Sequence, residues 1–211
     1  MPKKTFLRLD EDKQERVVRA AISEFHENGF EKAKIEAIAD NAGVAKGSIY
    51  QYFEDKKELF MYSVTWSMEY FMKEINKYTP LKEMDVFDYL LKDGRERVEL
   101  VKRESTLVMF YQDILSGKFG ELTKTINEEL WKIGDKYILQ LIAVGKKKGT
   151  VRTDLEDEIL LLFYKGVTSQ IDEYVFGEMK KADFELSEAK HEEIESTIKK
   201  MIRIMKTGMG C

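Results

Sequence analysis

The stretch that decides the fold is residues 37–53, Ala-Ile-Ala-Asp-Asn-Ala-Gly-Val-Ala-Lys-Gly-Ser-Ile-Tyr-Gln-Tyr-Phe. A helix-turn-helix needs a small residue where its two helices cross and a turn residue that tolerates positive φ. Ala39 meets the first need and Gly43, four residues later, meets the second. Four apolar residues fall at the inward offsets that join the helices: Ile38, Ala42, Val44 and Ile49. The stretch therefore predicts two short helices, at about residues 35–41 and 45–52, separated by a turn.

Outside this stretch, apolar residues also recur at the helical period, and the 211 residues include only two prolines. Further helices are expected at about residues 12–28, 55–78, 86–102, 105–115, 121–148, 154–180 and 187–206. The fold class predicted is all-α, with about nine helices in total. We divide it into an N-terminal three-helix helix-turn-helix domain, residues 1–55, and a larger C-terminal helical bundle, residues 56–211.

The composition describes a globular chain with a densely charged surface, because 43% of residues are hydrophobic and 35% are charged. Lys and Glu dominate the charged residues, which is typical of proteins from a hot source. The net charge is −4, and residues 1–60 alone, with 11 Lys and Arg against 12 Asp and Glu, have a net charge of −1. Any binding of DNA must therefore depend on a local arrangement of side chains and not on bulk charge.

Several function classes are disfavoured by what the sequence lacks. One cysteine, Cys211, and two histidines, His26 and His191, leave little for a metal centre, and no cofactor is expected. No HExxH motif, no phosphate-binding loop and no plausible catalytic triad is present, so we do not expect an enzyme. The longest stretch without a charge is ten residues, 59–68, which is too short to span a bilayer. With no apolar signal core at the N-terminus, the chain is expected to be soluble and cytoplasmic.

If residues 37–53 form a helix-turn-helix, the second helix enters the major groove of DNA. Lys46 would neutralise a phosphate or reach a guanine edge, Gly47 would leave room for the duplex, and Gln51 would read an adenine edge. The positions expected to face DNA are Lys46, Gly47, Ser48, Tyr50, Gln51 and Tyr52, with Lys56 at a further phosphate. A flexible arm with Lys3, Lys4 and Arg8 would add sequence-independent contacts. Taken singly, Tyr50 and Tyr52 also fit core aromatics and Lys46 fits a solvated charge, and Phe53 we assign to the core.

Residues 12–60 resemble the N-terminal DNA-binding domain of the TetR family of repressors. The resemblance runs through Ala20-Ala21-Ile22, Phe25, Asn28-Gly29-Phe30, Ile38-Ala39, residues 42–50, Tyr52-Phe53, Lys56 and Leu59-Phe60. The turn at residues 149–155 also resembles the loop before the family's eighth helix. Two positions depart from the family: Lys34 stands where Thr or Ser caps the second helix and touches phosphate, and Ala45 stands where Ser often caps the recognition helix. Lys34 can still reach phosphate, so we keep it among the DNA-binding candidates.

The resemblance implies a homodimer that binds a pseudo-palindromic double-stranded DNA operator, most often as a repressor, and that a small-molecule effector releases. From the aromatic residues we expect an apolar or amphipathic effector, and the candidate ligand residues are Trp66, Tyr70, Phe110, Tyr111, Trp131, Tyr137 and Phe163. Candidate residues of a dimer interface are Leu162, Gly166, Ser169, Ile194, Ile198, Met201, Ile202 and Met205. Aromatic stripes also fit a core, and both helix faces also fit packing inside one subunit. An effector-free DNA-binding or architectural protein is the alternative function.

Overall fold

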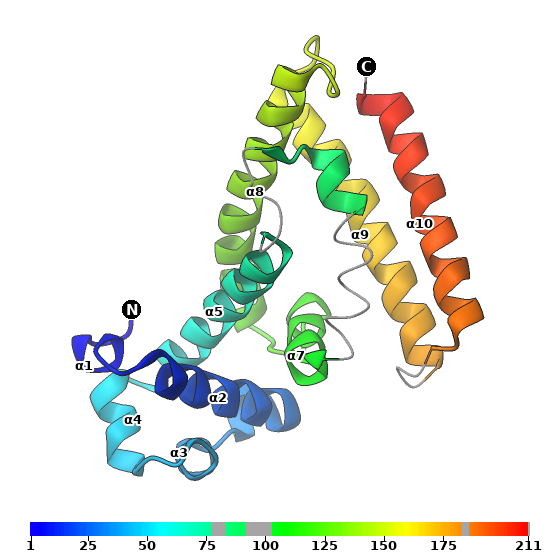
Figure 1. Ribbon diagram of the computed structural model, residues 1–211. Coiled ribbons are helices and arrows are strands. Elements are labelled where there is room, and N and C mark those ends of the chain that lie inside the picture. Colours follow the sequence, from blue (N-terminus) through cyan, green and yellow to red (C-terminus); the bar gives the residue numbers. More distant parts are fainter. Residues whose placement is uncertain (77–82, 92–102, 183–185, 211) are drawn as a thin grey trace. The chain divides into compact units, whose positions relative to one another are not determined.

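The computed structural model describes residues 1–76, 83–91, 103–182 and 186–210, and within these ranges it confirms an all-α fold without strands (Figure 1). Its helices with defined bounds are α1 (Lys4–Leu7), α2 (Glu11–Lys32), α3 (Ile35–Ala42), α4 (Lys46–Tyr52), α5 (Lys56–Asn76), α7 (Ser105–Leu115), α8 (Leu122–Lys148), α9 (Asp157–Lys181) and α10 (Glu188–Met209). Residues 86–91 are also helical, and the rest of the helix predicted at 86–102 lies outside the described residues. The total agrees with the prediction of about nine helices.

The contacts group the chain into two compact units. The first comprises Met1–Lys73 and Glu104–Lys132, and the second comprises Glu74–Arg103 and Ile133–Cys211. Two long helices, α5 and α8, therefore contribute to both units. This grouping by contacts does not test the functional division at residues 55 and 56, which stays a prediction. No helix in the described ranges is long and apolar enough to cross a membrane.

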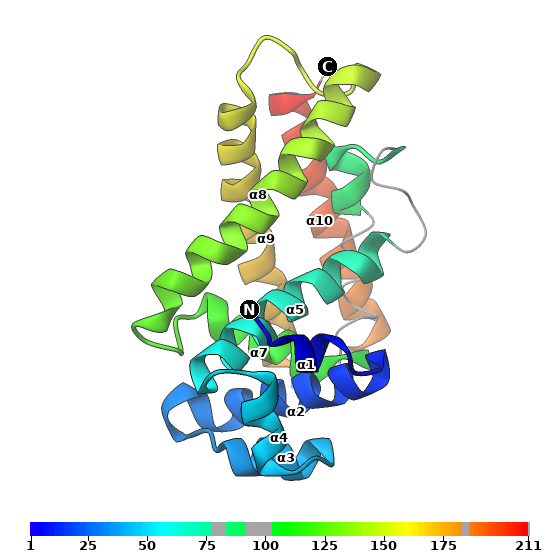
Figure 2. The same ribbon diagram turned by 90° about the vertical axis from the view of Figure 1, so that its left-hand side faces the viewer.

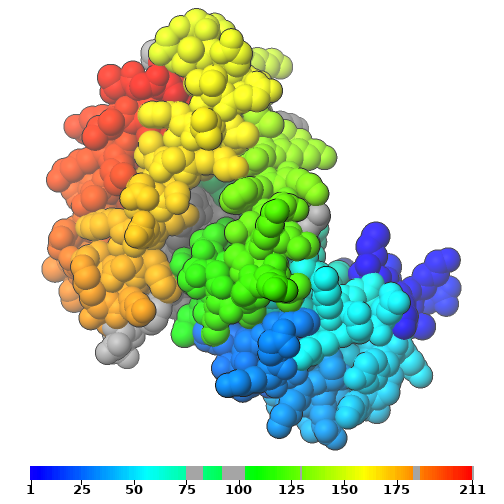
Figure 3. Space-filling model, turned by 180° about the vertical axis from the view of Figure 1, so that it is seen from behind, coloured from blue at the N-terminus to red at the C-terminus, as the bar shows by residue number. Residues whose placement is uncertain are grey.

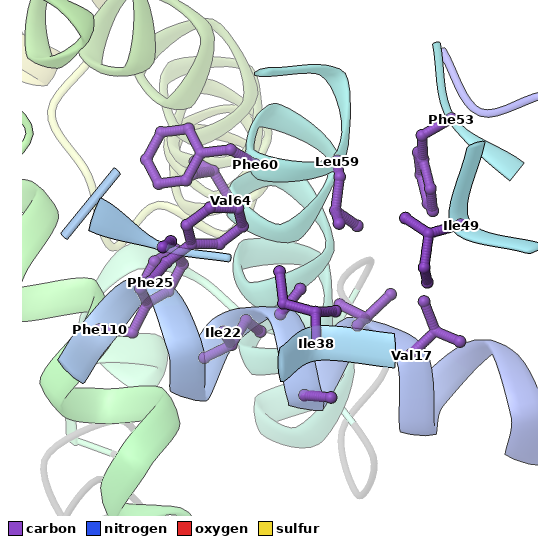
Figure 4. Close-up of a cluster of buried hydrophobic side chains, with 14 of the residues drawn as sticks. Val17, Ile22, Phe25, Ile38, Ile49, Phe53, Leu59, Phe60, Val64 and Phe110 are labelled. Atoms are coloured by element: carbon purple, nitrogen blue, oxygen red, sulfur yellow. The ribbon is translucent and has the colours of Figure 1, made fainter. Parts of the chain in front are cut away.

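The first unit is built around apolar side chains from helices α1 to α5, α7 and α8, and Figure 4 shows part of this core. Helix α2 packs against both α3 and α7, and α4 packs against α3 and α1. The ring of Phe60 from α5 lies 4.9 Å from that of Phe25 on α2 and 6.1 Å from that of Phe110 on α7. All three rings are fully buried, and each such burial contributes roughly 1.5–3 kcal/mol. The helix-turn-helix thus shares one core with α5 and α7.

In the second unit, α9 and α10 lie side by side and run in opposite directions (Figures 1 and 2). The buried residues of both helices are mostly apolar, and an ion-paired cluster joins the two helices. Glu178 of α9 binds the ammonium groups of Lys181 at 2.6 Å and of Lys190, on α10, at 2.5 Å. These two lysines lower the pKa of Glu178 to about 2. Ser187 caps α10 by accepting a hydrogen bond from the Lys190 amide.

Candidate nucleic-acid interface

The turn between α3 and α4 has the geometry that the sequence predicts. Gly43 adopts φ 67° and ψ 38°, a left-handed conformation that costs glycine little, and its amide donates to the carbonyls at the end of α3. Ala39, at the crossing, is fully buried. Ile38, Ala42 and Ile49 are buried between the helices, and Val44 is half-buried. The helix-turn-helix prediction is therefore confirmed at the level of structure.

The outward face of α4 presents most of the side chains predicted to read DNA. Lys46, Gly47, Tyr50 and Gln51 are exposed, and Ser48 is half-buried. The ring of Tyr50 is the large apolar group on this face, with 47% of the residue exposed. An ideal Cβ built on Gly47 would meet no atom of the described chain within 4 Å. The ammonium of Lys46 lies 3.7 Å from the carboxylate of Glu36, and both side chains are more than half exposed.

The predicted orientation of Tyr52 is wrong. Its residue is only 7% exposed, and its ring packs 5.7 Å from the ring of Phe6. The reason is helical geometry: Tyr52 follows Ile49 by three residues, and residues three apart share one face of a helix. Because Ile49 is 1% exposed, the same turn of α4 directs Tyr52 into the core. Phe53, which the sequence assigns to the core, is 1% exposed.

The two flanking lysines have different surroundings. Lys34, at the start of α3, has an exposed side chain. The ammonium of Lys56 donates to the carbonyls of Glu31 and Ala33 at 3.1 Å each, and it lies 4.9 Å from the ring centre of Phe30. Lys56 therefore holds the C-terminal end of α2 with two of the three donors of its ammonium group.

Lys34 and Ala45 are the two positions that differ from the family pattern of capping residues. As the sequence predicts, neither side chain caps its helix. At the start of α3, a carboxylate from another helix binds the backbone instead. The carboxylate of Glu24, on α2, accepts a hydrogen bond from the Lys34 amide at 2.8 Å, and Glu24 is 7% exposed. Sequence reasoning missed Glu24. The sequence could have indicated it, because Glu24 is an acidic residue seven positions after Val17 within the apolar stripe of α2, and a buried charge requires a partner.

The N-terminal segment is also not the flexible arm that its charges suggested. Residues 4–7 form α1, and Phe6 is fully buried. Lys3 donates from its side chain to the carbonyl of Tyr50 at 2.9 Å. The apolar Phe6, among lysines and a threonine, was the available signal that this segment packs.

Within the first unit, some of the predicted ligand residues meet in a polar cluster. Trp66 and Tyr70 stack at 5.3 Å, and the guanidinium of Arg19 lies over both rings. Arg19 forms two hydrogen bonds with the Glu104 carboxylate, at 2.7 and 3.2 Å, and the Tyr70 hydroxyl donates to that carboxylate at 2.6 Å. Burial and the bond to Glu104 raise the pKa of Tyr70. This cluster joins α2 to α5 and to the start of α7.

The other predicted ligand residues do not join that cluster. Phe110 belongs to the core of the first unit, where it lies 5.7 Å from Phe119. Tyr111 packs 5.8 Å from Phe71, and Trp131 is 55% exposed. Tyr137 and Phe163 belong to the second unit, where Tyr137 lies 5.3 Å from Tyr89 and Phe163 is 40% exposed. Phe110 is therefore a core residue, and the predicted ligand residues are divided between the two units.

The predicted dimer residues divide between a surface and a core. On α9, Leu162 is 68% exposed, and Gly166 and Ser169 are exposed on the same helix face. Figure 3 shows α9, in yellow to orange, along the surface of the second unit. On α10 the structure corrects the prediction, because Ile194, Ile198, Ile202 and Met205 are buried within this chain and Met201 is half-buried. The exposed apolar residue of α10 is Ile204, at 70%, which the sequence analysis did not select.

Comparisons with known proteins agree with this geometry. Residues 17–62 match the model of the family described as bacterial regulatory proteins, tetR family. A probable acrEF/envCD operon repressor of Escherichia coli (strain K12) is 23% identical over 176 residues, which cover 81% of this chain and 79% of that protein. Two solved structures share the fold, each covering 92% of this chain and 98% of its own. They are a fatty acid degradation regulator, FadR, from Bacillus halodurans (23% identity, TM-score 0.70) and the regulator FadR from Bacillus subtilis in complex with stearoyl-CoA (17%, 0.69).

Proposed function

We propose that this chain is a DNA-binding transcriptional regulator of the tetR family, not an enzyme, and that it acts as a ligand-responsive repressor. In this proposal two copies bind a pseudo-palindromic operator, and a small apolar or amphipathic effector releases them. The protein acts in the cytoplasm, where its operator is accessible. The similarity to an operon repressor supports repression as the direction of control.

The observation that carries the DNA-binding proposal is the outward face of α4. Gly47 has helical neighbours on both sides, and a Cβ at this position would have free space around it. Glycine in a helix costs roughly 0.5–1 kcal/mol relative to alanine, and nothing inside the chain offsets that cost. A close approach by a DNA backbone does require the absence of a side chain there. Lys46, Tyr50 and Gln51, exposed beside it, supply the phosphate and base contacts in our proposal.

The proposal for the dimer uses the exposed face of α9. Ile159, Leu162, Gly166 and Ser169 follow one another at helical spacing, and the two apolar residues are 49% and 68% exposed. A two-fold axis would bring this face against its own copy and bury both leucines. Ile204 of α10 is also exposed, at 70%, and in our proposal it takes part in the interface. The buried isoleucines of α10 support this interface from inside and do not take part in it directly.

The effector proposal rests on the neighbours and on the aromatic residues together. The Bacillus subtilis regulator is described in complex with stearoyl-CoA, an amphipathic molecule. An effector of that kind would change the separation of two reading heads that must stand about one DNA turn, roughly 34–36 Å, apart. Because the heads bind cooperatively as a pair, a small displacement suffices to lose their joint affinity. An effector-free DNA-binding protein remains the alternative function.

The DNA-binding proposal is tested by selection from a random-sequence pool of duplexes. We expect enrichment of a pseudo-palindromic sequence, and Lys46→Ala should weaken its binding and reduce the salt slope of log K by about one. Lys200→Ala, which removes an exposed charge from α10, is the matched control. Enrichment of no sequence, or equal losses in both variants, would contradict the assignment of α4 as the reading helix.

The dimer and effector proposals have separate tests. Leu162→Asp should yield monomers in analytical ultracentrifugation, whereas Leu115→Asp, at an exposed leucine of α7, should leave the assembly unchanged. Titration of stearoyl-CoA onto the protein bound to the selected duplex should release DNA. Retention of DNA throughout a panel of amphipathic and apolar molecules would favour the effector-free alternative.

A further inference from the structure

The carbonyl groups in the last turn of α4 need hydrogen-bond donors from outside the helix. The final four carbonyls of any helix lack partners within it, and a seven-residue helix is marginal by itself. In α4 these carbonyls belong to Ile49, Tyr50, Gln51 and Tyr52. The amide of Phe53 donates to Ile49 at 2.9 Å, which accounts for one of the four. The last turn of α4 contains no basic residue that would interact favourably with the helix dipole.

The N-terminal segment supplies donors to all three remaining carbonyls. The backbone amide of Lys3 donates to the Tyr52 carbonyl at 2.8 Å, and the ammonium of Lys3 donates to the Tyr50 carbonyl at 2.9 Å. The hydroxyl of Thr5 donates to the carbonyl of Gln51. These bonds join residues 46 to 49 positions apart in the sequence. They also place one positive charge at the negative end of the α4 dipole.

Phe6 fixes this segment in place. Its side chain is fully buried, and its ring centre lies 5.7 Å from that of Tyr52, 4.8 Å from that of Phe53 and 5.4 Å from that of Tyr62. The segment is therefore anchored in the same core as α4. Movement of the anchor and movement of the last turn of α4 are coupled through these rings.

We propose that residues 3–6 are the C-terminal cap of the DNA-reading helix, and that Lys3 and Thr5 are positioning residues for operator binding. They hold the backbone of Tyr50 and Gln51, so they direct the two side chains that extend toward DNA from the end of the helix. The proposal rests on the proposed function only for its effect on DNA. The capping itself is a property of the free protein and can be measured without DNA.

The test compares Lys3→Met, which removes the ammonium and keeps the apolar stem, with Lys200→Met as its control. Lys200 is an exposed lysine of α10, which takes no part in the proposed DNA surface. Thr5→Val removes the second donor with little change of shape, and Thr5→Ser should restore it. Amide hydrogen exchange of residues 49–53 is measured in the free protein. Affinity for the selected duplex and for a scrambled duplex is measured over a range of salt concentrations.

We expect Lys3→Met and Thr5→Val to raise exchange in the last turn of α4 by roughly two- to tenfold, the effect of one hydrogen bond. Affinity for the selected duplex should fall by a similar factor, while the salt slope and the affinity for the scrambled duplex stay unchanged. Lys200→Met and Thr5→Ser should behave like the wild type. Unchanged exchange overturns the capping. Raised exchange with unchanged affinity overturns the positioning role, and a salt slope lowered by about one assigns Lys3 to a phosphate contact instead. If the wild-type chain selects no sequence, the proposed function fails, whereas the exchange result still decides the capping.

Discussion

Replacement of Gly47 by alanine should have opposite effects on stability and on DNA binding. The added methyl group meets no atom within 4 Å in the free protein, so it carries no steric cost there. Alanine is favoured over glycine in a helix by up to about 1 kcal/mol. For a chain of 211 residues, 1 kcal/mol corresponds to a rise in Tm of roughly 2–4 °C. Gly47→Ala should therefore melt at the same temperature as the wild type or slightly above it.

At the DNA surface the same methyl group should be harmful. Over-packing by a methyl group in a close contact costs on the order of 1–3 kcal/mol, which corresponds to roughly a 5- to 150-fold loss of affinity. Fluorescence anisotropy with the selected duplex measures this loss, and calorimetry measures the Tm. Gly177→Ala is the control, because Gly177 is also in a helix and a Cβ there also meets nothing within 4 Å. It should gain stability and keep its affinity for DNA.

Two results would refute this reasoning about Gly47. A clear fall in Tm for Gly47→Ala would mean that glycine is required by the fold itself. Unchanged affinity for the selected duplex would mean that no DNA backbone approaches this part of α4. In the second case the outward face of α4 would lose its main support as the reading surface.

Tyr52→Ala should destabilise the first unit by roughly 3–5 kcal/mol in denaturant unfolding because its ring is in the core, whereas Tyr50→Ala should only weaken DNA binding. Equal stabilities of the two variants would contradict the placement of the two rings. Glu24→Ala removes the acceptor for the first amide of α3 and should cost about 1–3 kcal/mol of stability, while wild-type stability would show that water replaces the carboxylate. Glu178→Gln should lower Tm at pH 7, and this difference should disappear as the pH falls from about 4.5 to about 2. A carboxylate whose folded pKa is depressed stabilises only above its unfolded pKa and loses that effect on protonation, so an equal difference at both ends of this range would exclude the ion pair with Lys190 as its cause.

Local patterns in the sequence were sufficient for the long helices of the described ranges and for the turn. The offset from Ala39 to Gly43 and the buried residues around it follow from the helical period, which acts over neighbouring residues. Tyr52 was misplaced although the same period applies to it, because the side chain that covers it, Phe6, belongs to α1. No periodicity in residues 1–9 predicts this four-residue helix.

By itself the sequence determined that this chain is helical, where the helix-turn-helix lies and which glycine makes its turn, because steric limits on the backbone and burial of apolar stripes are encoded within a few residues. Only the tertiary structure decided which polar groups compensate one another. Glu24 caps α3, Lys3 and Thr5 cap α4, and Lys56 holds the end of α2. Each of these bonds joins residues 10 or more positions apart, and a donor at such a distance has no fixed spacing from its acceptor until the chain has folded.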